Sequence, residues 1–329
     1  MGAFASQLSA RIHSPEADMS SLHGKVYVVT GGLTGIGLQT SLVLALRGAD
    51  LLISARDIPR AQTALRKLEE SHPSIAKRVT IFAADFSTMD GSRKGAERVM
   101  ELTTRLDGLI NGVGRLIDVP WSVNEEGIEL SMAVNHFGTF VFTTTLLPLL
   151  RKTAKEPGSD VRIVTVGSNA MMQTPKNWKP SRKAFGETQA PTETKLNAFM
   201  VKFARYGTSK MLNTPFTVEL QRQLAAEGSD IVCVSLHPGG VATDGLLQYG
   251  VVISAIVKTL WLSPAQGALT SLLALTSPEV RANKKYRGAY LHPYGKIVKP
   301  EFAPATDPGF ARELWELTEQ IVAEGGLKV

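Results

Sequence analysis

Near its start the chain reads Val26-Tyr27-Val28-Val29-Thr30-Gly31-Gly32-Leu33-Thr34-Gly35-Ile36-Gly37. The first residues have the β-branched character of a buried strand, and the rest form a glycine-rich turn. Residues 38–47 are apolar at helical spacing and predict a helix that ends at Gly48. Glycines in such a turn bring backbone N–H groups close to a pyrophosphate, and the helix N-terminus adds a favourable partial positive charge. A strand, this turn and a helix in direct succession therefore predict a dinucleotide site; no Gly-Lys-Ser/Thr follows, so the turn is not a P-loop.

The same alternation of strand and helix continues along the chain. Continuous β-branched runs that alternate with helices indicate a parallel sheet covered on both faces. No Pro/Gly/Ser-rich linker interrupts the series, so we expect one α/β domain over residues 24–300, a Rossmann-type doubly wound parallel sheet. A helix is expected at 58–70. The strands expected after the first are 51–54, 79–83, 106–110, 161–166 and 231–236.

Four segments do not follow this rhythm. Residues 1–23 lack a sustained period and predict an N-terminal extension. Residues 171–200 are polar and contain several prolines, so we expect an insertion that loops out. Residues 240–262 are lipophilic and follow a strand end, where active-site loops of such sheets lie. Residues 301–329 predict a C-terminal helical extension.

Composition excludes several classes of protein. The chain has 329 residues, 43% of them hydrophobic, which is enough for a large core and excludes a mostly disordered or fibrous protein. The single cysteine, Cys233, excludes an intramolecular disulfide framework and favours a reducing compartment, so we expect a cytoplasmic protein. The net charge of +6 comes without long runs of like charge, so no nucleic-acid partner is expected.

Membrane and metal signals are weak. No run of eighteen apolar residues is present, so a membrane-spanning helix is not expected. The N-terminus fits the loose myristoylation pattern at Gly2, and residues 251–262 are lipophilic, so contact with a membrane surface is an alternative. The six histidines lack the spacing of metal ligands, and no metal is expected.

The end of the second expected strand bears on the choice of cofactor. In this fold the adenosine ribose lies about 20 residues beyond the glycines, where an acidic residue favours NAD. Here the sequence is Ser54-Ala55-Arg56-Asp57, and Arg56 offers a cationic fork suited to a 2′-phosphate. We therefore expect NADP, with NADPH preferred over NADH. The alternative is a surface arginine that pairs with Asp57.

A second pattern suggests proton transfer. Tyr206 and Lys210 are four residues apart and would share one face of a helix. A tyrosine is normally too weak an acid to ionise near neutrality, and a nearby lysine charge lowers its pKa. The pair therefore predicts a tyrosine that serves as general acid and base.

Together these patterns resemble the short-chain dehydrogenase/reductase family from about Leu22 to Pro300. Order and spacing of the motifs both agree with the family. The resemblance is greatest to retinol-dehydrogenase-like enzymes and to fungal reductases of secondary metabolites. The motifs are Thr30-Gly31-x-x-x-Gly35-Ile36-Gly37, Asn111-Gly112-Val113-Gly114, Asn135, Gly167-Ser168, Tyr206-x-x-x-Lys210 and His237-Pro238-Gly239.

The resemblance implies roles for individual residues. Tyr206 would be the general acid/base and Ser168 would hydrogen-bond the substrate oxygen. Lys210 would lower the Tyr206 pKa and hold the nicotinamide ribose, and Asn135 would anchor a water that relays protons to Lys210. Asp85 would contact the adenine amine, although alone it would pass for a turn residue. The residues expected to bind the cofactor are Gly31, Leu33, Thr34, Gly35, Ile36, Gly37, Arg56, Asp85, Phe86, Asn111, Gly112, Val113, Tyr206, Lys210, Pro238, Gly239, Val241 and Thr243.

Some features depart from the family. The family's Asn-Asn-Ala-Gly is replaced by residues 111–114, Asn-Gly-Val-Gly, so packing beside the adenine ribose is expected to differ. Ser168 and Tyr206 lie 38 positions apart, whereas the shortest members separate them by about a dozen. The intervening 171–200 segment is either part of the substrate entrance or a passive surface insertion. Pro215 falls in the helix expected near Tyr206 and should bend it.

These residues lead us to expect an NADP-dependent oxidoreductase that interconverts an alcohol and a ketone or aldehyde. The apolar segment after Pro238-Gly239, including Leu246 and Leu247, favours a lipophilic small-molecule substrate. A non-catalytic NADPH-binding regulator and a membrane-peripheral retinol- or steroid-type dehydrogenase are the alternatives. Family members often form homo-oligomers, and nothing in this sequence decides that point.

Overall fold

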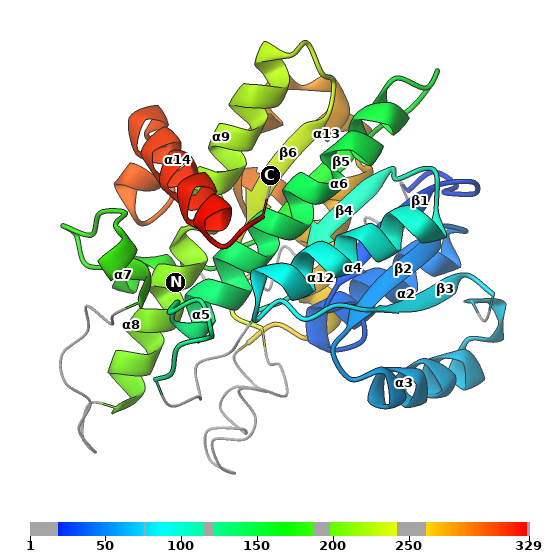
Figure 1. The fold of residues 1–329 in the computed structure, drawn as a ribbon. Helices are drawn as coiled ribbons and strands as arrows, with labels where there is room; N and C mark the ends of the chain where they lie inside the picture. The colour runs from blue at the N-terminus through cyan, green and yellow to red at the C-terminus, as the bar shows by residue number, and fades with distance from the viewer. Residues whose placement is uncertain (1–18, 76, 115–120, 187–197, 242–260, 328–329) are drawn as a thin grey trace.

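The computed structural model describes residues 19–75, 77–114, 121–186, 198–241 and 261–327 (Figure 1). Its centre is a sheet in the order β3-β2-β1-β4-β5-β6-β7-β8. The α/β class and the doubly wound parallel sheet are thus confirmed. The strands are β1 (Val26–Thr30), β2 (Asp50–Ala55), β3 (Val79–Ala83), β4 (Gly108–Asn111), β5 (Arg162–Val166), β6 (Val232–Leu236), β7 (Tyr290–His292) and β8 (Lys296–Ile297).

The strand order reverses at β1, which pairs in parallel with both β2 and β4. Ligands of such sheets bind beyond the carboxyl ends of the strands at this reversal, so the fold points to the ends of β1 and β4. Strands β7 and β8 were not expected from the sequence. They have three and two residues, too few for a readable period, and β8 runs antiparallel to β7.

Helices cover both faces of the sheet (Figure 1). One hydrophobic cluster joins the sheet to α4, α6, α9 and α14, and the other joins it to α2 and α12. Val28 belongs to the first cluster and Val29 to the second, which explains why successive residues of a central strand are both apolar. The helices are α2 (Gly35–Leu46), α3 (Ile58–Ser71), α4 (Met89–Leu102), α5 (Leu130–Met132), α6 (Thr139–Ala154), α7 (Arg182–Gly186), α8 (Ala198–Met211), α9 (Asn213–Ala226), α12 (Pro264–Thr276), α13 (Pro278–Ala282) and α14 (Pro308–Glu324).

A π-helical turn, Ala133–Gly138, joins α5 to α6 and is called the π-turn below. The continuous run Leu130–Ala154 is long and apolar enough to cross a membrane by length and composition alone. Within the structure, however, 83% of its apolar window is buried. It is therefore a core helix of the fold.

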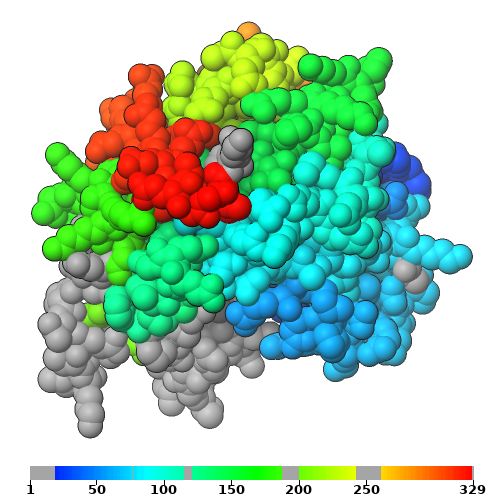
Figure 2. Space-filling view, in the orientation of Figure 1, coloured from blue at the N-terminus to red at the C-terminus, as the bar shows by residue number. Residues whose placement is uncertain are grey.

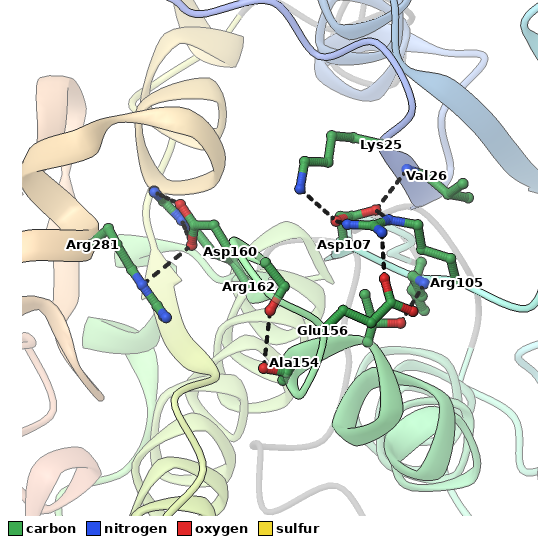
Figure 3. A network of polar contacts seen from close by, with 12 residues as sticks. Lys25, Val26, Arg105, Asp107, Ala154, Glu156, Asp160, Arg162 and Arg281 are labelled. Carbon is green, nitrogen blue, oxygen red and sulfur yellow. Dashed lines mark hydrogen bonds and ion pairs between the residues drawn. The ribbon is translucent and has the colours of Figure 1, made fainter.

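Charged side chains tie together the amino ends of the central strands (Figure 3). The buried carboxylate of Asp107 accepts hydrogen bonds from Arg105 Nε at 2.7 Å and from the Val26 amide at 3.0 Å, and it lies 3.2 Å from Lys25 Nζ. Arg162, at 1% exposure, binds Asp160 and donates to a carbonyl of α12. This edge of the sheet lies opposite the glycine-rich turn.

The 171–200 segment does not simply loop out over its described part. Met171, Trp178 and Phe185 are buried in the first hydrophobic cluster. Trp178 packs against Phe310 of α14, with ring centroids 6.1 Å apart. The polar composition of the segment gave no indication of these buried side chains, because the residues that bury them are distant in the sequence.

The expected bend at Pro215 is a break between two helices. Helix α8 ends at Met211 and α9 begins at Asn213, which places Pro215 in the first turn of α9. The first amides of a helix have no intrahelical acceptor, so a proline costs little there.

Candidate active site

The glycine-rich turn lies at the carboxyl end of β1 and leads into α2. Gly31 adopts a φ of +70°, and a Cβ on Gly37 would lie 2.2 Å from the Gly31 carbonyl oxygen. Thr34 precedes α2 in extended conformation and makes no side-chain cap, and the first turn of α2 carries no acidic residue. No side chain of this cap position competes for the first amides of α2, which is compatible with the predicted anion site.

Thr30 connects this turn to the end of β4. Its hydroxyl donates to the Ile110 carbonyl at 3.1 Å and accepts from the amides of Gly112 and Val113 at 2.9 and 3.0 Å. A Cβ on Gly112 would lie 2.8 Å from the Thr30 carbonyl oxygen. This close crossing gives a physical reason for glycine at the position where the family has asparagine, and Thr30 is a supporting residue that the sequence-based site omitted.

Asn111 lies at the last position of β4 and is buried. Its Nδ2 donates to the Thr143 hydroxyl on α6 at 2.9 Å. Its Oδ1 is buried without a hydrogen-bond partner in the part of the chain that the structure describes. An orphaned acceptor of this kind is costly unless a ligand or water reaches it.

The predicted adenosine contacts lie at the ends of β2 and β3. Arg56 is exposed directly after β2, and Asp57 caps α3 by accepting from the Arg60 amide at 3.0 Å. Asp85 accepts from both the amide and the hydroxyl of Ser87, as a turn residue does. Phe86 is buried against the ring of a core phenylalanine, so its side chain serves packing.

Tyr206 and Ser168 come together because α8 packs closely on the turn after β5. A Cβ on Gly207 would lie 2.2 Å from the Ala170 carbonyl oxygen, so only glycine permits this approach. Ser168 caps the 3₁₀ turn Asn169–Gln173 and shares a side-chain hydrogen bond with Tyr206. Gly207 was missed by the sequence reasoning, although its place next to the tyrosine was a usable signal.

The expectation that Lys210 lowers the pKa of Tyr206 is wrong in this structure. Burial raises the pKa of Tyr206 to about 12, and only the hydrogen bond with Ser168 acts in the other direction. Lys210 Nζ donates to the Val166 carbonyl at 2.8 Å, and burial lowers the pKa of Lys210 to about 8. Desolvation acts on both groups and disfavours the charged form of each.

Asn135 lies on the π-turn and faces Lys210 across Gly114. Its Nδ2 donates to the Ser209 hydroxyl at 2.8 Å, and that hydroxyl donates to the Tyr206 carbonyl at 2.7 Å. A Cβ on Gly114 would lie 3.1 Å from Lys210 Nζ and 3.4 Å from Asn135 Oδ1. The structure thus brings together the four residues predicted to be catalytic, with Ser209 as an additional link.

A buried ion pair lies beside Tyr206 and was not predicted. Arg205 Nε is 3.3 Å from Glu129 Oε1, and each side chain is 3% exposed. Glu129 also caps α5 by accepting from the amides of Ser131 and Met132 at 2.8 and 3.1 Å. The pair therefore connects α8 to the start of the helical run that carries the π-turn.

The Pro238-Gly239 segment brings the end of β6 to the glycine-rich turn. Gly239 has a φ of +96°, and Val241 forms a parallel bridge with Leu262. A Cβ on Gly267 would lie 2.6 Å from Val241 and 3.1 Å from Ile36, which places these two predicted residues side by side. The predicted contacts Thr243, Leu246 and Leu247 lie outside the described residues.

No metal centre is found among the residues that the structure describes, since no three His, Cys, Asp or Glu side chains are grouped to hold an ion. His237, for example, is buried, and burial with the neighbouring His292 lowers the pKa of His237 to about 4.

Comparison with known proteins agrees with this geometry. Residues 25–180 match the short chain dehydrogenase family. The chain is 36% identical over 332 residues to Short chain dehydrogenase/reductase dpchH of Colletotrichum higginsianum, covering 94% of this chain and 78% of that protein. It is 32% identical over 316 residues to a short-chain dehydrogenase/reductase of Armillaria gallica, covering 94% and 96%. A solved short chain dehydrogenase from Burkholderia cenocepacia, in complex with NADP, has the same fold, with a TM-score of 0.60 and 24% identity over 84% of this chain and 98% of that one. The chain therefore belongs to the short-chain dehydrogenase/reductase family.

Proposed function

We propose that this protein is an NADP(H)-dependent oxidoreductase that interconverts an alcohol and a ketone or aldehyde on a lipophilic small molecule. One observation carries the proposal: Ser168, Tyr206, Lys210 and Asn135 meet beside the glycine-rich turn at the carboxyl ends of the strands. The hydroxyl, the phenol, the ammonium and the carboxamide of these four residues together suit proton transfer to a carbonyl oxygen.

The residues at the turn fit a nicotinamide dinucleotide. Gly31 and Gly37 leave a cradle that a Cβ would fill, and the uncapped start of α2 would hold the pyrophosphate. The orphaned Asn111 Oδ1 lies at the end of β4, where the adenine ribose is expected. When bound, the nicotinamide would supply the hydride, and the protein would position the reactants and move the proton.

The protonation states are compatible with the donation of a proton to a carbonyl oxygen. With a pKa of about 12, the Tyr206 phenol is neutral at pH 7 and has a proton to donate to the developing alkoxide. Ser168 would donate a hydrogen bond to the same oxygen and orient the carbonyl. Lys210, with a pKa of about 8, is mostly protonated at pH 7 and would hold the ribose hydroxyls. A water anchored by Asn135 would relay protons to it.

Exposed apolar side chains on segments that follow the central strands support a lipophilic substrate. Several of the exposed large apolar side chains lie on the segments that follow β4, β5 and β6. Exposed apolar surface next to a binding site is typical of sites for apolar ligands. These side chains are Trp121, Val123, Met172, Met200 and Trp261.

The choice of NADP rests on Arg56. Its side chain is exposed at the end of β2, and Asp57 is already engaged as the cap of α3. The relative from Burkholderia cenocepacia is itself complexed with NADP. A guanidinium at this position would bind a 2′-phosphate with two parallel hydrogen bonds.

Thermal unfolding with NADPH and with NADH tests the cofactor. A ligand at 100 times its Kd stabilises the fold by about 2.7 kcal/mol, which is readily measured. We expect a larger shift with NADPH, and R56A should reduce it to the NADH level while R60A, on the neighbouring helix turn, should not. A larger shift with NADH would contradict the assignment of Arg56.

Oxidation of NADPH with a panel of hydrophobic ketones and aldehydes tests the reaction. Turnover of apolar members, with small sugars and keto acids inactive, is the expected result. Cofactor binding without turnover of any carbonyl compound would favour a regulator that senses NADPH.

A further inference from the structure

The π-turn is held from two sides, and only one of them belongs to the site described above. Asn135 binds Ser209 on α8, next to the catalytic tyrosine. The following residue, His136, is 2% exposed, and its ring stacks on Phe185 of α7 at 6.0 Å and 19°. Successive residues of the same turn thus contact the catalytic helix and the opposite side of the core.

His136 makes its polar contact with the C-terminal helix. Its Nε2 lies 2.8 Å from the hydroxyl of Thr318 on α14. Thr318 is fully buried, so neither group can exchange this partner for water. The two residues are 182 positions apart in sequence, and the contact joins the end of the chain to its centre.

The direction of this hydrogen bond follows from the neighbouring bond. The Thr318 hydroxyl donates its one proton to the Leu314 carbonyl at 2.7 Å. It must therefore accept from His136, which places the ring proton on Nε2. Burial lowers the pKa of His136 to about 3, so the ring stays neutral and this tautomer persists at working pH.

The packing around α14 keeps the acceptor in place. Trp315 stacks on Phe216 of α9 at 5.7 Å and contacts Phe140, just beyond the π-turn, at 4.7 Å. Figure 2 shows the red C-terminal helix lying against the green segment that contains α7. Thr318 is thus presented by a rigid helix that is packed against the core.

We propose that Thr318 is a positioning residue: through the hydrogen bond from His136, the C-terminal helix fixes the π-turn so that the Asn135 carboxamide stays against Ser209 and Lys210. A π-turn leaves its backbone less regular than an α-helix, and such turns occur frequently at functional sites. Contacts on both sides of the π-turn would hold the Asn135 side chain in place to within a fraction of an ångström.

The test compares T318V, which keeps the shape and removes the acceptor, with T318S, which restores it. The matched control is T276V, because Thr276 makes the same bond to the carbonyl four residues earlier, on α12, away from the site. Hydrogen exchange of the amides at 133–138 should become about tenfold faster in T318V and stay at the wild-type rate in T318S and T276V. If T318V does not accumulate as folded protein, T318A takes its place.

The kinetic readout rests on the proposed function. With a carbonyl compound turned over by the wild type, T318V should lower kcat by about ten- to a hundredfold, because small misplacements at a catalytic site cost that much. KM for NADPH should not change, and T318S should recover kcat. If the wild type reduces no carbonyl compound, the proposed function fails while the exchange experiment still decides the positioning role.

Two results would overturn the proposal. If the amides at 133–138 exchange at the wild-type rate in T318V, the hydrogen bond does not hold the turn. Equal acceleration in every peptide of T318V, or a T318S variant as fast as T318V, would assign Thr318 to general stability.

Discussion

The two edges of the central sheet treat their charged groups in opposite ways. At the amino ends of the strands, Asp107 is surrounded by Lys25, Arg105 and a backbone amide, and Arg162 has Asp160 as partner (Figure 3). At the carboxyl ends, Lys210 is buried against a carbonyl oxygen. At the amino edge each of these charges has a partner of opposite sign, whereas at the carboxyl edge burial disfavours the charged form of Lys210.

This contrast separates stability from chemistry. The attraction between buried opposite charges offsets part of the cost of their desolvation, and removal of one partner leaves an uncompensated charge. A buried group without a counter-charge has a shifted pKa and can exchange a proton, which a catalytic group requires. We expect substitutions at the two edges to have correspondingly different effects.

The largest effect is expected at the carboxyl edge. Y206F removes the proton donor and should lower kcat by about 10²- to 10⁴-fold, the usual contribution of general acid catalysis. NADPH binding and the thermal midpoint should stay close to wild type, since the ring remains in its packing site. Steady-state kinetics and a cofactor titration check both parts, and substantial residual turnover would refute the role of Tyr206.

At the amino edge the effect should fall on stability. D107A leaves Arg105 and Lys25 without their shared carboxylate and should lower the free energy of unfolding by about 3 kcal/mol. The kcat of the folded fraction should not change. Urea unfolding measures the loss, and D50A is the matched control.

Asp50 also binds an arginine, Arg78, at 3.0 Å, but its side chain is 54% exposed. Exposed ion pairs contribute little, so D50A should cost no more than about 1 kcal/mol. Similar losses in D50A and D107A would show that burial does not distinguish the two carboxylates.

A smaller effect should appear in the pH dependence of stability. Burial lowers the pKa of Lys210 from 10.5 to about 8, so between these values the unfolded chain binds more protons than the folded one. The free energy of unfolding should therefore rise with pH in this window, by at most about 1.4 kcal/mol per pH unit. Below pH 8 the full penalty of the buried charge is present.

The variant K210M isolates this contribution. The difference in stability between wild type and K210M should change by about 2 kcal/mol between pH 8 and 10, with wild type gaining as pH rises. A flat difference for K210M would contradict the desolvation of Lys210.

Much of the fold could be predicted because it depends on local patterns. The first six strands lie within two residues of their expected limits, since each is a short run rich in apolar residues that is bounded by polar residues or glycine in the sequence. Strands β7 and β8 escaped prediction because they exist through pairing with β6 and with each other. The burial of Trp178 and Phe185 was not predicted because most residues around them in the sequence are polar.

In the site, too, features that depend on local sequence could be predicted and features that depend on distant contacts could not. Tyr206, Lys210, Ser168 and Asn135 could be named because their order and spacing resemble a known family, and the structure brings them together. The sign of the Tyr206 pKa shift could not be predicted, because desolvation depends on everything packed around the phenol. Gly207, Thr30 and the Glu129–Arg205 pair were missed because their roles lie in contacts with distant segments.

The sequence by itself determined the α/β class, the position of the glycine-rich turn and the identity of the candidate catalytic residues, since these depend on side-chain type and near-neighbour spacing. Only the tertiary structure decided how deeply those groups are buried, which carbonyl holds Lys210, and that the last helix reaches back to the π-turn through Thr318. The physical reason is that burial and hydrogen-bond partners are set by residues far apart in the chain, and local patterns carry no record of which of them meet.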